Sequence, residues 1–149
     1  MVKMGFKVFN VDIKNKIYEE LDQELSKSDI IFVGGGNTSY LLQKTLESGF
    51  DKIVKNHVSK GKWYIGSSAG SILAGPSTEP FWGKDERQDL PPDFKMHSFQ
   101  ALNLVDFVIL PHGNIQKHHE MFKNEIIPKF SNSFDFKLLA DNEVIIIDE

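Results

Sequence analysis

A short apolar run that leads into glycines and serines, residues 63–75 (WYIGSSAGSILAG), limits most strongly what this chain can fold into. Gly66 and Gly70 flank Ser68 in the pattern G-x-S-x-G, which is typical of a strand that turns sharply into a helix with a serine at the corner. Only small residues fit beside such a tight turn. The pattern predicts that the Ser68 hydroxyl stands above a sheet; the alternative is an ordinary glycine–serine turn between a strand and a helix.

Other apolar segments along the chain alternate between strand-like and helix-like spacing. Strands are expected at 6–13, 29–33, 63–65, 107–110, 138–140 and 144–147, and helices at 16–26, 38–47, 51–59, 72–74 and 116–130. Pro128 must end or kink the last helix, and residues 76–92, rich in proline and charge, are expected to form a long loop. This alternation predicts an α/β fold, with a mostly parallel sheet and helices on both faces, in one domain over residues 1–149.

Four of the expected strands end in unusual segments, which read GGGNT, GSSAGS, PHGN and ADN. Ligands in open α/β folds bind at the carboxyl ends of the strands, so these four segments can converge on one crevice. A serine hydroxyl there needs a base within hydrogen-bond reach, and the base needs an orienting group. Of the five histidines, His112 alone lies directly at a strand end, and it is the predicted base.

The acidic partner of the base has more than one candidate. Asp141 follows an apolar strand and comes after His112 in the chain, whereas Asp85, Glu86 and Asp106 are competitors. The order serine, histidine, aspartate differs from that of the common α/β-hydrolases, but unrelated triads use different orders.

Backbone N–H groups beside these motifs can stabilise a developing oxyanion. The serine turn offers the N–H of Ala69, and the glycine loop offers that of Gly36. The alternative for GGGNT is a phosphate-binding turn, but the segment has neither the G-x-G-x-x-G spacing nor the Lys-Ser/Thr pair of a P-loop.

The composition excludes several classes of function. A net charge of −4 and the lack of a basic cluster argue against nucleic-acid binding. Arg87 is the single arginine, so any anion must be recognised by lysine, histidine or backbone N–H groups. The absence of cysteine excludes a thiol nucleophile, a disulfide framework and a cysteine-bound metal. No run approaches the ~18 apolar residues of a membrane span, and residues 1–12 lack the pattern of a signal peptide. We therefore expect a cytoplasmic protein with no membrane or nucleic-acid partner and no metal or cofactor.

The blocks IIFVGGGNTSYLL, KGKWYIGSSAGSILAG and LPHGN, in this order and separation, resemble peptidase family S51, which includes dipeptidase E (aspartyl dipeptidase) and its cyanophycinase relatives. The resemblance covers roughly residues 6–148. It implies a three-layer α/β sandwich similar to class I glutamine amidotransferases, with a serine in place of their cysteine nucleophile. It also implies roles for five residues: nucleophile Ser68, base His112, acid Asp141, and oxyanion donors Gly36 and Ala69.

Two features depart from the family pattern. The GGGNT block lies close to Met1, so the first strand–helix units of the family, and a strand pair after Glu149, are expected to be missing. Such a loss would expose apolar sheet surface, and we expect the chain to form a homo-oligomer or to be part of a longer product. The segment after His112 has no arginine to select an N-terminal aspartate; the expected substrate contacts are Asn37, Lys117 and His118.

The function implied by the resemblance is hydrolysis of short peptides, including those with an N-terminal aspartate, through an acyl-enzyme on Ser68. One alternative is a truncated, inactive relative that serves as a binding or oligomerisation module. A third is an esterase or amidase built on the same serine turn. Labelling of Ser68 by a fluorophosphonate would separate an active enzyme from an inactive module, because labelling needs an activated serine.

Overall fold

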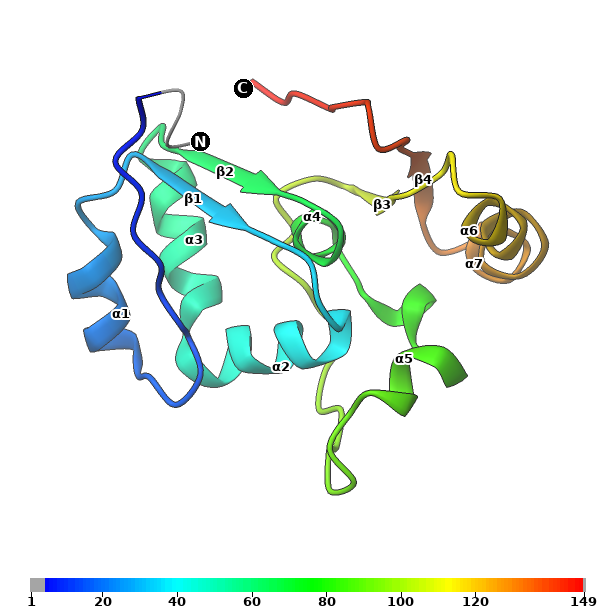
Figure 1. The fold of residues 1–149 in the computed structure, drawn as a ribbon, viewed down its shortest axis with the longest axis horizontal. Coiled ribbons are helices and arrows are strands. Elements are labelled where there is room, and N and C mark those ends of the chain that lie inside the picture. Colours follow the sequence, from blue (N-terminus) through cyan, green and yellow to red (C-terminus); the bar gives the residue numbers. More distant parts are fainter. Residues whose placement is uncertain (1–4, 149) are drawn as a thin grey trace.

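The computed structural model describes residues 5–148, apart from the side chains of Lys84 and Asp85, and helices and strands alternate along it (Figure 1). The strands are β1 (Ile30–Val33), β2 (Trp63–Gly66), β3 (Phe107–Leu110) and β4 (Asp135–Leu138). The α-helices are α1 (Tyr18–Leu25), α2 (Thr38–Ser48), α3 (Phe50–Ser59), α4 (Ala69–Ala74), α5 (Lys84–Gln88), α6 (Gln116–Met121) and α7 (Ile127–Phe130). A 3-10 helix, η2 (Glu79–Phe81), and a π-helix, η3 (Phe122–Ile126), complete the order.

The four strands form two parallel pairs, β1 with β2 and β3 with β4. Val33 lies opposite Gly66, so β1 and β2 end at the same level and the loops that follow them lie side by side. Leu110 lies opposite Leu138 in the second pair, with the same consequence for its loops. Parallel strands joined through helices are the α/β architecture that the sequence predicted.

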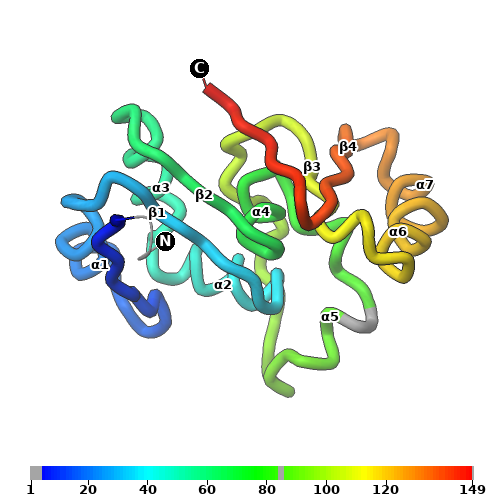
Figure 2. The backbone as a smooth tube through the Cα atoms, turned by 45° about the horizontal axis from the view of Figure 1, so that its top comes forward, coloured from blue at the N-terminus to red at the C-terminus, as the bar shows by residue number. Residues whose placement is uncertain are grey.

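Helix α4 joins the two halves of the molecule and lies between the two strand pairs in both views (Figure 1 and Figure 2). All of its residues are buried, and Leu73 is fully enclosed. On one side of it, the apolar stripes of α1 and α3 pack with Ile31 and Val33 of β1 in the larger core. On the other side, strand β3 packs against η3 in a smaller core, formed by Val108, Leu110, Phe122 and Ile126.

Three strand predictions are wrong. Residues 6–13 and 144–147 have no regular secondary structure, and the strand expected at 138–140 is instead β4, which starts three residues earlier. A strand needs a neighbour to accept its backbone hydrogen bonds, and no strand in the described chain pairs with the two end segments. Phe136 packs against the smaller core, which fixes where β4 pairs with β3.

The helix predicted over residues 116–130 is continuous but changes its hydrogen-bonding pattern along its length, and Pro128 does not end it. It divides into α6, the π-helix η3 and α7, and Pro128 lies in the first turn of α7, where its missing N–H leaves no intrahelical bond unmade. The loop predicted over residues 76–92 contains only the short η2 and α5.

Two surface properties bear on the partners expected of this chain. Phe32, Trp63 and Ile65, on one face of the β1–β2 pair, are 39–52% exposed, so this face of the sheet is apolar and open. Within residues 5–148, no helix combines the length and the apolar character that crossing a bilayer requires.

Candidate active site

Ser68 lies at the point where β2 turns into α4. Its φ angle is 54°, in a region that is unfavourable for any residue with a side chain. Two backbone hydrogen bonds hold the turn against β1, one from Ser67 N–H to the Val33 carbonyl (2.9 Å) and one from Gly70 N–H to the Gly34 carbonyl (3.0 Å). Backbone strain of this kind persists only where the surroundings impose it, and it is common at functional sites.

The two glycines of G-x-S-x-G are required by close packing of backbone on backbone. A Cβ atom on Gly66 would lie 2.5 Å from the Gly70 carbonyl oxygen. One on Gly70 would lie 2.7 Å from the carbonyl carbon of Val33, and closer still to its oxygen. The pattern that first drew attention to Ser68 therefore has a steric cause.

Two further side chains support the turn, and the sequence analysis did not identify them. The Tyr64 hydroxyl donates to the Gly70 carbonyl (2.7 Å), and the Ser71 hydroxyl donates to the Ser68 carbonyl (2.6 Å). Burial raises the pKa of the Tyr64 phenol above its ordinary value, so the phenol keeps its proton and stays a donor. Both bonds are made to backbone atoms, which residue type alone does not reveal.

His112 and Asp141 lie next to Ser68, as the sequence analysis expected. His112 Nδ1 is 2.6 Å from Asp141 Oδ1, and His112 Nε2 is 2.9 Å from Ser68 Oγ. The carboxylate can only accept, so Nδ1–H donates to Asp141 and Nε2 accepts from the serine hydroxyl. His112 also has a positive φ angle, of 63°. In the described chain the other two non-glycine residues with positive φ are asparagines, which adopt this conformation more readily.

Asn114 holds the loop that carries Asp141. Its Oδ1 accepts a hydrogen bond from the Asp141 N–H (2.9 Å), and the neighbouring Gly113 N–H donates to the Leu139 carbonyl (2.9 Å). The loops that follow β3 and β4 are thus joined at the residues that come directly after His112. The PHGN motif predicts a strand end, but the role of Asn114 depends on a contact with a distant loop, which the sequence does not show.

Two of the three competing acids, Glu86 and Asp106, lie elsewhere. Glu86 accepts a hydrogen bond from the Ser39 N–H (2.7 Å) at the start of α2. Asp106 directly precedes β3, at the opposite end of that strand from His112. The side chain of Asp85 lies outside the described part of the structure.

The predicted oxyanion donors lie on the two loops that flank the serine. A Cβ on Gly35 would be 3.3 Å from Ser68 Cβ, which shows how closely the glycine loop approaches the serine. Ala69 is the first residue of α4, and Gly36 precedes the cap of α2. Among the backbone hydrogen bonds given for the described residues, neither the Gly36 N–H nor the Ala69 N–H is a donor.

The three residues expected to contact substrate differ in their surroundings. Asn37 caps α2, because its Oδ1 accepts from the Tyr40 N–H (2.9 Å) while its Nδ2 donates to the Glu86 carbonyl (2.7 Å). Lys117 is exposed on α6. His118 is half-buried, and its ring lies 5.6 Å from that of His112 between centroids.

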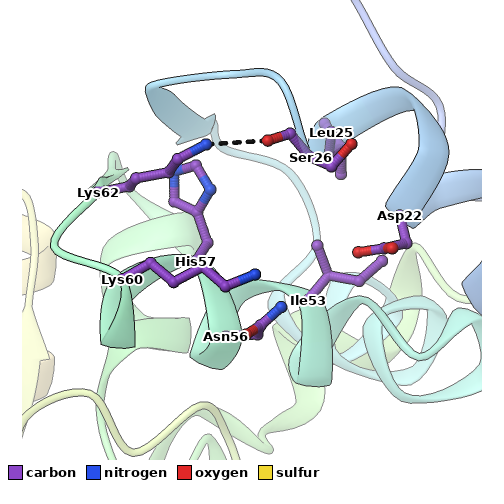
Figure 3. A pocket seen from close by; sticks show the side chains of 8 residues that line it. All are labelled: Asp22, Leu25, Ser26, Ile53, Asn56, His57, Lys60 and Lys62. Carbon is purple, nitrogen blue, oxygen red and sulfur yellow. Dashed lines mark hydrogen bonds between the residues drawn. The ribbon is translucent and has the colours of Figure 1, made fainter.

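A small cavity lies apart from these residues, between α1 and α3 (Figure 3). Its volume of about 30 Å³ has room for a water molecule or two. Lys62 and His57 border it, and burial lowers the pKa of the His57 imidazole below its ordinary value. Among the described residues, no group of three or more histidine, aspartate or glutamate side chains is placed to bind a metal ion.

Comparison with known sequences gives consistent matches. The sequence model of peptidase family S51 matches residues 1–149. An uncharacterised peptidase of Listeria monocytogenes is 32% identical over 144 residues, an alignment that covers 97% of this chain and 68% of the relative. Peptidase E of Shewanella amazonensis is 36% identical over 113 residues, which are 74% of this chain and 45% of that protein.

A solved structure shows the same fold. The crystal structure of a candidate peptidase E protein from Listeria monocytogenes matches with a TM-score of 0.72 and 31% sequence identity. The match covers 97% of this chain and 71% of that one. The α/β class expected from the sequence is therefore confirmed by a related structure as well as by the strand pairing.

Proposed function

Because this chain belongs to peptidase family S51, we propose that it hydrolyses short peptides with Ser68 as nucleophile, His112 as general base and Asp141 as the orienting acid. The observation that carries the proposal is the unbroken chain of hydrogen bonds from Ser68 Oγ through the His112 ring to Asp141, of 2.9 and 2.6 Å. Both lengths are normal for direct hydrogen bonds, so proton transfer needs no rearrangement of these side chains.

In the proposed reaction, Ser68 Oγ attacks the scissile carbonyl carbon while its proton passes to His112 Nε2. The negative charge moves to the carbonyl oxygen, which accepts hydrogen bonds from the N–H groups of Gly36 and Ala69. Loss of one such donor typically lowers turnover about 10²–10³-fold. The imidazolium then gives its proton to the leaving amine, and the acyl group stays on the serine. A water molecule attacks the acyl carbon, its proton goes to Nε2, and Ser68 is released.

The proposed substrate is a short peptide. Asn37, Lys117 and His118 remain the proposed substrate contacts, and a preference for an N-terminal aspartate remains a prediction. The single arginine, Arg87, has its guanidinium 5.8 Å from the centre of the Trp82 ring, where the two interact as a cation–π pair.

The cytoplasmic location expected from the sequence also stays a prediction, which cell fractionation would test.

The test uses a fluorophosphonate label together with hydrolysis of a panel of dipeptides and tripeptides. We expect wild-type protein to be labelled on Ser68, Ser68→Ala to lose both labelling and hydrolysis, and His112→Ala to lose most of both. Ser67→Ala is the matched control, because both hydrogen bonds that Ser67 makes in the turn use backbone atoms: its N–H donates to Val33 and its carbonyl accepts from Gly70. Hydrolysis at the wild-type rate by Ser68→Ala would overturn the assignment.

A second function, as a binding or oligomerisation module, is favoured by one observation. The exposed apolar side chains Phe32, Trp63 and Ile65 form a continuous patch across the β1–β2 pair and would be covered in a homo-oligomer. Protein that is folded, oligomeric by sedimentation and unreactive toward the fluorophosphonate would support this module over the peptidase.

A further inference from the structure

His118 lies between the proposed base and the smaller core. Its ring is 5.6 Å from the His112 ring at an angle of 54°, and 6.2 Å from the Phe122 ring at 39°. Phe122 is 3% exposed and is fixed among the apolar residues of that core. His118 therefore connects the imidazole of His112 to a rigid part of the molecule.

The imidazole of His112 needs such support, because its hydrogen bonds leave one motion open. The bonds to Asp141 and Ser68 hold the two nitrogens, but they resist swinging of the ring out of its plane only weakly. The side chain is one-third exposed, so solvent borders part of it. A ring packed beside it restricts that swing.

We propose that His118 is a positioning residue, which keeps the His112 imidazole in the plane that joins Asp141 to Ser68. This inference rests on the proposed function, because it assumes that His112 is the base. It assigns His118 a role toward His112 in addition to the substrate contact proposed above.

The contact matters most after the serine has been acylated. Ser68 Oγ then has no proton to donate, so the hydrogen bond to His112 Nε2 is lost. Asp141 and the His118 ring remain to hold the imidazole while it takes a proton from the attacking water. The C–O bond to Ser68 then breaks, and that proton passes to the serine oxygen. Deacylation should therefore depend on His118 more than acylation does.

The contact uses the ring of His118 and not its nitrogen. Nδ1 of His118 is buried and has no hydrogen-bond partner among the described residues, which makes an imidazole less stable here than an apolar ring. Phenylalanine has a ring of similar width and no polar atom. A phenylalanine at this position should preserve the contact.

The experiment measures acylation and deacylation separately with a chromogenic ester, in His118→Ala, His118→Phe and the control His97→Ala, in which an exposed histidine on a distant loop is removed. We expect His118→Ala to slow deacylation about ten- to a hundredfold, with a much smaller effect on the acylation burst. His118→Phe should recover most of the deacylation rate that His118→Ala loses, although its binding of the ester should weaken because the substrate contact proposed for His118 is lost. His97→Ala should match wild type. Thermal unfolding checks that each variant is folded.

Two results would overturn the inference: deacylation at the wild-type rate in His118→Ala, or equal slowing in the alanine and phenylalanine variants. The second would mean that the imidazole itself acts. Proton NMR of the resting protein gives a readout that does not need turnover, because the downfield Nδ1–H signal of His112 should broaden in His118→Ala and stay sharp in His118→Phe. A wild-type protein that gives no burst and no fluorophosphonate label, yet shows this NMR pattern, would sink the proposed function while leaving the contact established.

Discussion

Replacing Gly70 by alanine tests the account of the serine turn most directly. The added Cβ would lie 2.7 Å from the Val33 carbonyl carbon and 3.0 Å from the Gly34 carbonyl oxygen, where ordinary contact begins at 3.4 Å. Both obstacles are backbone atoms of β1 and its following loop. Val33 is paired with β2 and also accepts the Ser67 N–H, so it cannot yield without breaking those bonds.

The expected loss of stability follows from this geometry. Adding a methyl group to a filled site typically costs about 1–3 kcal/mol, and a backbone obstacle places Gly70→Ala at the upper end, about 3 kcal/mol. For a domain of this size, that corresponds to a fall in Tm of about 6–12 °C. Any shift of the turn would also move the Ala69 N–H, so the fluorophosphonate should label the folded variant more slowly.

The assay is thermal unfolding followed by circular dichroism, with Gly83→Ala as the control. Its added Cβ would meet nothing nearer than the Phe81 carbonyl oxygen at 3.9 Å, so we expect a change within about 0.5 kcal/mol. Gly66→Ala, with its closest obstacle at 2.5 Å, should also be strongly destabilised. A Gly70→Ala variant that unfolds within 2 °C of the control, a margin of about 1 kcal/mol or less, would refute the packing of the turn against β1.

Two further predictions concern other residues. Asn114→Ala removes the acceptor of the Asp141 N–H, so we expect kcat to fall about tenfold or more while Tm changes little, as steady-state kinetics and thermal unfolding would show; an unchanged kcat would contradict the role given to Asn114. Burial lowers the pKa of His57, so the unfolded chain takes up a proton at a higher pH than the folded one. The free energy of unfolding should therefore fall as the pH drops below about 6.5, and urea titrations of His57→Phe should show a shallower decline; an identical pH dependence would contradict this.

Local chemistry explains why so much of the site could be predicted. Ser68 and His112 each belong to a short motif at the end of an apolar strand, and parallel strands bring such ends together. Asp141 was chosen in the same way and also lies in place, although β4 ends at Leu138 and not directly before it. Asp141 still reaches His112 because the Leu139 N–H bonds to the Leu110 carbonyl beyond the last residue of the strand.

The parts that could not be predicted depend on contacts between distant segments. Residues 144–147 have the apolar composition of a strand, yet Val144 is 76% exposed, because strand formation depends on a pairing partner that composition does not reveal. Tyr64, Asn114 and His118 all act on neighbours through hydrogen bonds or ring contacts. Such roles appear only when the backbone geometry is known.

The division of the site between two strand pairs has a consequence for how it is assembled. Ser68 belongs to the β1–β2 pair, whereas His112 and Asp141 belong to the β3–β4 pair. The connection runs through α4, where the N–H groups of residues 101–105 bond to the carbonyls of residues 73–76. The strained backbone at Ser68 and at His112 is held by hydrogen bonds within each half, so only the contact between the two side chains depends on this joint. The hydrogen bond between Oγ and Nε2 therefore reports the packing of the two halves against each other, and it should be lost when α4 loosens even if each core remains folded.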